Sequence, residues 1–397
     1  MDRYIRPLAE LIVRFGANVQ PGQIVSLFSE PGKEELTRAV AEVAYEQGAM
    51  FVDLTVFDLH LKRARALRAS PESLSFVPPW YGEQLLALGD HRCARIVLAG
   101  PVAPRLMDDV DPELLGKDNL PNIAETGKVV NDRTTNWTIA PCPTPEWAEF
   151  VHPDLPSAQA LERLWEEVSH VCRLDEPDPV AAWTDRMDRL AAVASKLDGL
   201  RLDVLRFDGP GTSLRVGLLP SSRWLSACLD TVDGIRHAAN IPTEEVFTTP
   251  DPERTDGVVT STKPLFTSGV LIEGLKVRFE RGRAVEINAN RAAETLRTQA
   301  ALDAGAARLG EVALVDRESR IGSLGTVFYD TLLDENAASH IALGQGLGFA
   351  LDEQDAARMN SSEIHIDFMI GANDVAVTGV TADGREVPLL REGRWEV

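Results

Sequence analysis

The residues best suited to chemistry lie in the last two-fifths of the chain, and the clearest pair is His365 and Asp367. They stand in the segment EIHIDFMIG (363–371), in which the residues alternate in character. Strand side chains point alternately to opposite faces, so a strand here places His365, Asp367 and Met369 on one face. An imidazole and a carboxylate two positions apart on a rigid strand are natural ligands for a divalent metal ion.

Carboxylates head two further extended segments. Glu311 begins an otherwise apolar run (310–315) that predicts a strand, and it is either a solvated edge residue or a ligand. Glu244 and Glu245 are adjacent in a proline-flanked extended segment (240–250). Neighbouring strand residues face opposite ways, so at most one of these two acids points at a shared site. The alternative for the pair is a solvated acidic turn.

A second histidine lies between these segments. The sequence predicts a helix over 335–344 that carries His340, with Asp334 as its N-cap and Gly344 as its stop. On such a helix, His340 is either a metal ligand or an ordinary hydrogen-bonded histidine. The HExxH, GxSxG and P-loop motifs are absent, so no standard catalytic motif competes with a metal site built from these segments.

The elements that must position these residues change in type along the chain. Helical patterns at 4–15 and 34–45 alternate with strand patterns at 23–28, 50–57 and 95–99. This βαβ rhythm predicts a parallel sheet covered by helices.

The later part of the chain has a different organisation. A proline-rich connection (140–156) leads to helices predicted at 157–171 and 179–197, and strand and turn patterns dominate from residue 200 onward. Residues 175–179 are a plausible hinge, so we expect an N-terminal α/β domain over 1–178. A C-terminal metal-binding catalytic domain is expected over 179–397.

Composition bounds the partners. The chain has 397 residues and a net charge of −21, which argues against nucleic acid or an anionic membrane as a partner. The charge favours divalent cations or cationic substrates, with simple solubility as the alternative reading. The N-terminus lacks an apolar signal region, and no apolar run approaches the roughly 20 residues of a membrane span. We therefore expect a cytoplasmic protein.

Taken together, five C-terminal blocks in order carry a family resemblance. They are NIPTEEVFTTPD (240–251), STKPL (261–265), GEVALV (310–315), VFYDTLLDENAASHIALG (327–344) and EIHIDFMIG (363–371). With earlier stretches such as LIVRFGANVQPGQ (11–23), these blocks resemble the M29 family of metalloaminopeptidases, of the thermophilic aminopeptidase T and aminopeptidase S type. The resemblance covers nearly the whole chain.

The resemblance implies both a site and an activity. It makes five residues the ligands of two neighbouring divalent metal ions, zinc or cobalt: Glu245, Glu311, His340, His365 and Asp367. Two histidines and three carboxylates also suit manganese. The implied fold is α/β, with an N-terminal helix-covered parallel sheet and a mixed α+β C-terminal domain. The implied protein is a homodimer that hydrolyses N-terminal residues from peptides through a metal-bridged water.

One position departs from the family pattern. A tyrosine usually follows the metal-binding histidine by seven positions, and here that position is Leu347. Leucine cannot donate a hydrogen bond to a developing oxyanion. Tyr329 is a candidate for the missing role and Glu244 a weaker catalytic candidate, so the catalytic acid or base is left open.

Two alternatives follow from this departure. One keeps the fold and the metal site but changes the reaction, as in distant relatives that resemble iron-dependent ring-cleaving dioxygenases. The other is a non-catalytic homologue that binds peptide or metal.

Overall fold

The computed structural model describes residues 2–118, 120–121, 123–226, 228–267 and 269–397, and these divide into two compact units. Unit 1 comprises Met1–Asp109, Glu125–Met187 and Ala227–Thr243; unit 2 comprises Val110–Ala124, Asp188–Ser226 and Glu244–Val397. Each unit is thus built from interleaved segments, while the single boundary between 178 and 179 stays a prediction. Within the described residues, no helix is both long and apolar enough to cross a membrane.

Unit 1 is organised around a four-stranded sheet in which every neighbouring pair is parallel. Its strands, in the order β2-β1-β3-β4, are β2 (Phe51–Val56), β1 (Ile24–Ser29), β3 (Ala94–Ala99) and β4 (Trp137–Pro141). Every second residue of β1 and β3 is buried. The parallel sheet expected from the βαβ rhythm is therefore confirmed.

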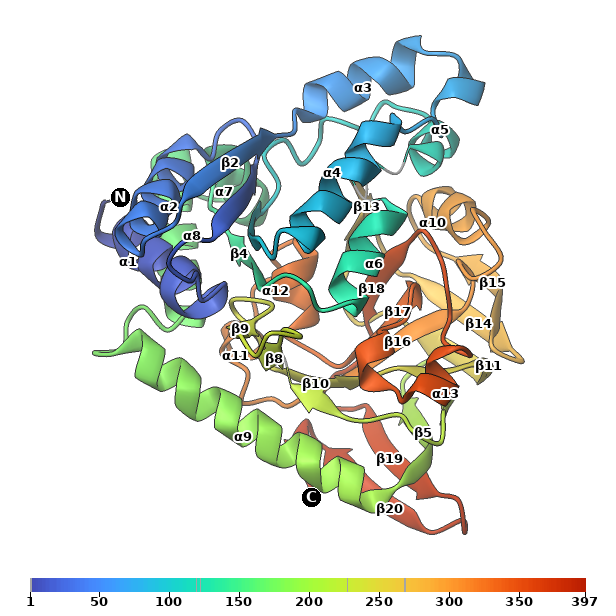
Figure 1. Cartoon of the computed structure of the whole chain (residues 1–397). Coiled ribbons are helices and arrows are strands. Elements are labelled where there is room, and N and C mark those ends of the chain that lie inside the picture. The colour runs from blue at the N-terminus through green and yellow to red at the C-terminus, as the bar shows by residue number, and fades with distance from the viewer. Residues whose placement is uncertain (1, 119, 122, 227, 268) are drawn as a thin grey trace. The chain divides into compact units, whose positions relative to one another are not determined.

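Helices account for most of the rest of unit 1 (Figure 1). The first expected helix continues from α1 into a short π-helical turn at Ile12–Gly16. The α-helices are α1 (Asp2–Leu11), α2 (Glu34–Glu46), α3 (Leu59–Arg68), α4 (Pro79–Asp90), α6 (Ala124–Asn131), α7 (Pro145–Val151) and α8 (Ser157–Val171), and a small hairpin is formed by β8 (Cys228–Asp230) and β9 (Arg236–Ala238). The long helix α9 (Pro179–Leu200) passes from the segments of unit 1 into those of unit 2.

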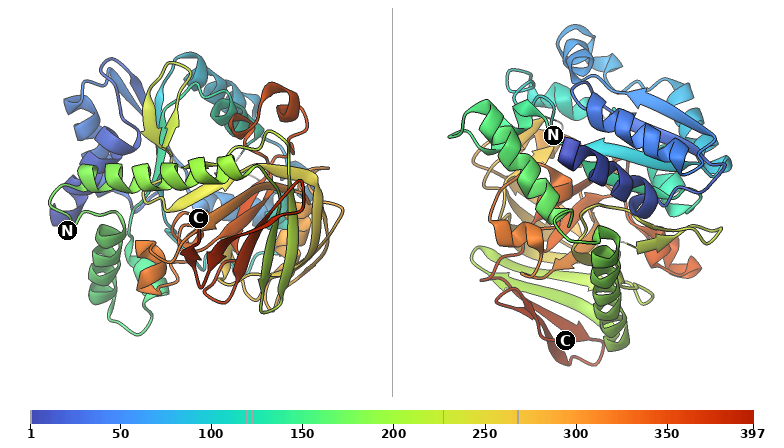
Figure 2. Two further views of the ribbon diagram at one scale, coloured as in Figure 1. Left: turned by 90° about the horizontal axis from the view of Figure 1, so that it is seen from below. Right: turned by 90° about the vertical axis from the view of Figure 1, so that its left-hand side faces the viewer.

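The larger sheet of unit 2 is antiparallel throughout its eight strands (Figure 2). In spatial order they are β15 (Arg283–Asn288), β14 (Lys276–Glu280), β11 (Pro250–Thr260), β6 (Thr212–Leu218), β5 (Leu202–Gly209), β19 (Ala376–Thr381), β20 (Glu386–Arg391) and β21 (Arg394–Trp395). Leu190, Ala194 and Leu197 of α9 belong to the hydrophobic core of this unit.

A second antiparallel sheet of unit 2 carries the residues of interest. Its order is β18 (His365–Met369), β17 (His340–Gly344), β16 (Leu309–Val315), β10 (Glu245–Thr248) and β7 (Leu225–Ser226). Core residues alternate along its strands and share one hydrophobic cluster with the eight-stranded sheet: Val246, Val312, Leu314, Ile341, Leu343, Ile366 and Phe368. Because strand side chains alternate, the residues between them point to the opposite face.

The remaining elements of unit 2 are short. They are α5 (Pro112–Lys117), β12 (Leu265–Thr267), β13 (Val270–Ile272), α10 (Ala293–Ala300), α11 (Arg320–Leu324), α12 (Thr331–Glu335) and α13 (Glu353–Ala356). Helix α12 packs against β18 and β12. The mixed α+β character expected for the C-terminal part is confirmed.

One element differs from its prediction. The helix expected over 335–344 is wrong, because α12 ends at Glu335 and His340 begins the strand β17. The run from His340 to Gly344 pairs with β16 on one side and β18 on the other, and all five of its residues are buried. A short apolar run buried on both faces shows no clear period, so its length and pattern fit a helix as well as a strand.

Candidate metal centre

All five predicted ligands project from the face of the smaller sheet that lies opposite its hydrophobic core. On each strand they alternate with core residues, as Glu245 does with Val246 and Glu311 with Val312. A small residue occupies the same face between them, where Ala342 is paired with Glu311 and with Asp367. The strand period of two therefore gathers residues that are as far apart in the sequence as Glu245 and Asp367.

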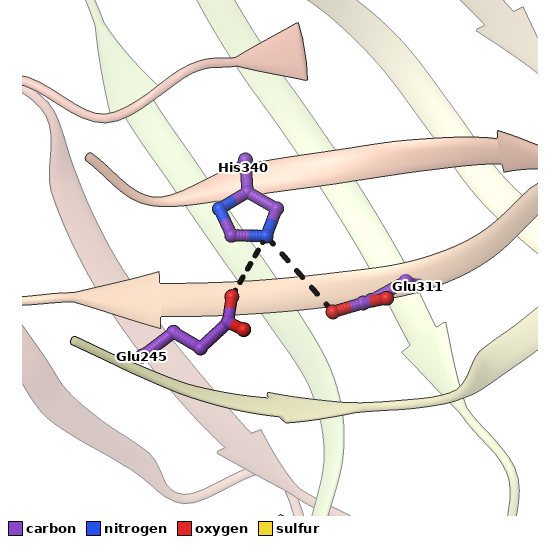
Figure 3. Close-up of side chains that lie close together, drawn as sticks. All are labelled: Glu245, Glu311 and His340. Carbon is purple, nitrogen blue, oxygen red and sulfur yellow. Dashed lines mark ion pairs between the residues drawn. The ribbon is translucent and has the colours of Figure 1, made fainter. Parts of the chain in front are cut away.

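The first group consists of Glu245, Glu311 and His340, whose ligand atoms all lie within 4.8 Å of one another (Figure 3). His340 Nε2 lies 3.0 Å from Glu245 Oε2 and 3.9 Å from Glu311 Oε1. All three residues are buried. Figure 3 shows the two carboxylates approaching the same ring nitrogen from neighbouring strands.

The second group consists of Glu311, His365 and Asp367, also within 4.8 Å. His365 Nε2 lies 3.3 Å from Glu311 Oε2 and 3.4 Å from Asp367 Oδ2. The His365 side chain is 32% exposed, whereas that of Asp367 is 11% exposed. The second group is therefore the one that solvent reaches.

Glu311 is common to both groups. One of its carboxylate oxygens faces His340 and the other faces His365. The Glu311 carboxylate therefore offers one oxygen to each of the two groups.

Both histidines are oriented by the main chain. His340 Nδ1 lies 2.9 Å from the Glu335 carbonyl oxygen, and His365 Nδ1 lies 2.8 Å from the Gln345 carbonyl oxygen. A carbonyl only accepts, so each Nδ1 carries the proton and each Nε2 presents its lone pair when the ring is neutral. This arrangement is the usual way in which proteins hold a metal-binding imidazole.

The electrostatics of the cluster favour a positive charge inside it. Burial disfavours the charged form of His340, but Glu245 and the other nearby carboxylates raise the pKa of His340 well above its usual range. Burial likewise opposes charge on His365, while Asp367 and Glu311 raise its pKa. The carboxylates thus favour a positive charge among them. Protonated histidines supply that charge here, and a bound divalent ion would supply it as well.

The carboxylates respond in different directions. Burial raises the pKa of Glu311 despite its hydrogen bond with His365. For Asp367, burial works against ionisation, but the charge of His365 and its hydrogen bond hold the pKa below its usual range.

A test of the fit comes from the carboxylate oxygens themselves. Among the described residues, Glu245 Oε2 and Asp367 Oδ1 are buried without a hydrogen-bond partner. Glu245 Oε2 is close to His340 Nε2, but the two do not meet hydrogen-bond geometry. Buried polar atoms are rarely left unsatisfied, and a missing ion is one of the ordinary reasons. The donor set therefore fits divalent metal.

Sequence reasoning missed the residues that support this cluster. Glu335 is 9% exposed, and burial together with the charges of Asp367 and Glu245 raises its pKa well above the usual range. The fully buried Asn336 accepts the Glu244 N–H at 2.7 Å and donates to the Leu332 carbonyl at 2.9 Å. The available signal is the polar run Asp334-Glu335-Asn336, which the sequence pattern assigns to the start of a helix.

The structure also places the three less certain candidates. Glu244 is fully buried but is outside both three-residue groups. Tyr329 is half-buried, and its backbone adopts the left-handed conformation, with φ 54°. Leu347 is half-buried, and its N–H and carbonyl both bond to the Thr249 hydroxyl, at 3.1 and 2.9 Å. Their catalytic roles stay predictions.

The fold and this carboxylate-and-imidazole cluster are those of a metalloenzyme. A family model described as thermophilic metalloprotease (M29) matches residues 1–395, and the chain belongs to this family. The family resemblance recognised in its segments is thereby confirmed, and the chain is a metal-dependent hydrolase.

Relatives match over essentially their full lengths. Aminopeptidase T of Thermus thermophilus is 39% identical, with 100% of this chain and 99% of the relative covered. Aminopeptidase 2 of Geobacillus stearothermophilus is 36% identical, with 100% and 97% covered.

Solved structures confirm the fold. Wild-type AmpT from Thermus thermophilus superposes with a TM-score of 0.88 at 39% identity, covering 100% of both chains. The 2,5-dihydroxypyridine dioxygenase from Pseudomonas putida KT2440 gives 0.53 at 12% identity, covering 99% of this chain and 96% of the other. The second likeness shows a shared fold alone.

Proposed function

We propose that this member of the M29 family is an aminopeptidase that uses two divalent metal ions. One ion is held by Glu245, Glu311 and His340, and the other by Glu311, His365 and Asp367. The observation that carries this proposal is the division of the Glu311 carboxylate, with one oxygen toward each histidine. The names of the relatives support the aminopeptidase activity.

The mixed nitrogen and oxygen donor set suits zinc or cobalt, with manganese also compatible. When bound, a pair of such ions supplies a nucleophilic water at neutral pH and polarises the scissile carbonyl. The chain's own contribution is to fix the two imidazoles through the Glu335 and Gln345 carbonyls, so that their Nε2 atoms point into the site.

Peptides with a free N-terminus are the proposed substrates. The two metal groups and Glu335 bring four carboxylates together. Glu335 lies outside the three-residue groups, so its carboxyl group is not used by the two ions, and a protonated α-amino group beside it would favour its charged form and pair with it. The partly exposed His365 marks the side from which that peptide enters.

Tyr329 is proposed to donate the hydrogen bond to the developing oxyanion, which Leu347 cannot donate. Asp334 accepts the N–H groups of Phe328 and Asp330, one on each side of Tyr329, at 3.0 and 3.3 Å. This carboxylate is buried and lies 3.9 Å from Lys263 Nζ. A left-handed tyrosine held in place this firmly is the kind of local strain that clusters at functional sites.

Two measurements test the proposal. Elemental analysis of protein purified without chelators should find close to two zinc or cobalt ions per chain, and a single iron would instead favour dioxygenase-like chemistry. Activity on leucine or arginine p-nitroanilide should rise when cobalt is added to the metal-free protein. No hydrolysis in a fully loaded protein would contradict the aminopeptidase assignment and leave a metal-binding homologue.

The assembly belongs to the same proposal. We expect the homodimer that the family resemblance implies, and a cytoplasmic location stays a prediction.

A further inference from the structure

Two buried asparagines hold the two ends of β17, the strand that lies between β16 and β18. Asn336 is fully buried and stands in the turn that precedes His340. Asn360 is 5% exposed, and its side chain reaches the carbonyl of Gly344, the last residue of the strand. Asparagine is mostly an exposed residue, and a buried one normally has its amide hydrogen-bonded. Each asparagine is therefore placed to fix the chain at its own end of β17.

Asn336 links the two ligands Glu245 and His340 of the first group. Its side-chain oxygen accepts the Glu244 N–H at 2.7 Å, and the next residue is the ligand Glu245. Its side-chain nitrogen donates to a carbonyl of α12 at 2.9 Å. The carbonyl of the residue before it, Glu335, lies 2.9 Å from His340 Nδ1. One turn thus fixes both the backbone that presents the carboxylate of β10 and the orientation of the imidazole of β17.

The same turn is fastened to β16, the strand between β10 and β17. Ser319 Oγ donates to the Asn336 carbonyl at 2.7 Å, and Ser339 Oγ accepts the Val315 N–H at 3.1 Å. Ser319, Asn336 and Ser339 are all 2% exposed or less. A buried polar network whose members are hydrogen-bonded holds a single arrangement of the backbone. The start of β10, the end of β16 and the start of β17 are therefore fixed relative to one another.

Asn360 serves the second group from the other end of β17. Its side-chain nitrogen donates to the Gly344 carbonyl at 2.5 Å, and its own carbonyl accepts the Gly346 N–H at 3.0 Å. The Gly346 N–H and the Gln345 carbonyl belong to one planar peptide group. That carbonyl lies 2.8 Å from His365 Nδ1. Asn360 therefore fixes the peptide group that orients the His365 imidazole.

The hydrogen bonds of the two side chains have no residue in common. Among the described residues, the Asn336 side chain is bonded to Glu244, Leu332 and Glu335, and the Asn360 side chain to Gly305, Arg308 and Gly344. We propose that Asn336 positions the ligands of one metal ion and Asn360 those of the other. The inference rests on the two-ion site proposed above, in which neither asparagine is itself a ligand.

The alternative is that both asparagines only stabilise the fold. Removing either side chain leaves buried N–H or carbonyl groups unpaired, which lowers the stability of the protein under both explanations. A lower melting temperature therefore does not distinguish them. Weaker binding of one ion without the other does distinguish them, because a general loosening of the sheet would weaken both ions alike.

Metal binding by full-length Asn336→Ala and Asn360→Ala variants tests the proposal. Calorimetric titration of the metal-free proteins with zinc gives the affinities of the two ions. Anomalous difference maps from crystals held at a cobalt concentration near the wild-type dissociation constant show which ion is affected. Each variant is the matched control for the other, because both replace a buried asparagine at an end of the same strand.

The expected losses are separate. Groups that orient metal ligands typically contribute about 10- to 100-fold to metal affinity, so Asn336→Ala should weaken the ion of the first group by this factor. Asn360→Ala should weaken the ion of the second group by the same factor. In each variant the other ion should bind within about threefold of the wild-type affinity. If an alanine variant fails to fold, the serine variant at that position, which keeps a hydroxyl in the buried space, carries the same prediction.

The outcomes separate this inference from the proposed activity. Equal weakening of both ions in both variants, weakening of the opposite ion, or no weakening at all would overturn the inference, and a wild type with two ions would still support the proposed site. A wild type with two ions and variants with separate losses, but no hydrolysis of a p-nitroanilide, would contradict the proposed aminopeptidase activity alone. A wild type that binds fewer than two ions would contradict both.

Discussion

Replacing Glu311 with glutamine should strongly weaken the binding of both metal ions without unfolding the protein. Glutamine keeps the size of the side chain but removes one negative charge, and that charge faces His340 on one side and His365 on the other. Two unit charges about 4 Å apart interact by about 4 kcal/mol at an effective dielectric of about 20. Since about 1.4 kcal/mol is tenfold, each ion should bind about a thousandfold more weakly.

The metal-free variant should behave in the opposite way. Burial already raises the pKa of Glu311, and Asp367 and Glu245 repel its charge. Removing that charge should leave the melting temperature of the metal-free protein unchanged or slightly higher. In the wild type, metal at about a thousand times its dissociation constant adds about 4 kcal/mol of stability, and the variant should lose this increment.

Calorimetric titration with zinc and a melting curve with and without metal measure both effects. Glu318→Gln is the matched control, because Glu318 is an exposed glutamate of the same unit. Two equivalents bound by Glu311→Gln within about tenfold of the wild-type affinity would refute the assignment of Glu311 as a shared ligand. A variant that unfolds without metal would refute the electrostatic reasoning.

Three further substitutions probe other parts of the account. His365→Ala should abolish hydrolysis of a p-nitroanilide with the circular dichroism spectrum unchanged, and full activity would exclude His365 from the site. Tyr329→Phe should lower kcat on the order of a hundredfold while metal content stays at the wild-type level, and an unchanged kcat would leave the hydrogen-bond donor unassigned. His237→Gln should flatten acid destabilisation. Burial lowers the pKa of His237 from 6.5 to about 4, so the unfolded chain binds a proton that the folded one refuses as pH falls between these values. The wild type should lose about 3 kcal/mol across that window. The free energy of unfolding is measured by denaturant titration at each pH. An equal loss of stability in the variant would contradict this prediction.

Elements whose period is unambiguous could be predicted from the sequence. The alternation around His365 and Asp367 marked β18, and the apolar run after Glu311 marked β16. The parallel sheet of unit 1 followed from three apolar strand patterns separated by helices. In each case the local pattern and the tertiary environment demand the same conformation.

The position of His340 could not be predicted from local sequence patterns. Its run is buried on both faces by β16 and β18, so the sequence shows neither a period of two nor a clear helical one. The register that places Ala313 opposite His340 depends on contacts between distant segments. Without that register, no periodicity argument brings Glu245 to His340, and only the family resemblance supplied the complete ligand set.

Glu335 was missed for a related reason. An acidic residue in a run of polar residues is most often solvated, and the burial of Glu335 depends on α12 packing against β18. The role of Leu347 likewise depends on its surroundings, since its backbone is hydrogen-bonded to the hydroxyl of Thr249, which lies between β10 and β11.

An anomalous difference map from a crystal of the cobalt-loaded protein tests the central proposal most directly. We expect two peaks per chain about 3.5–4 Å apart. Glu245 and His340 should contact one peak, His365 and Asp367 should contact the other, and Glu311 should contact both. A single peak, or two peaks that do not share Glu311, would contradict the two-metal site proposed for this enzyme.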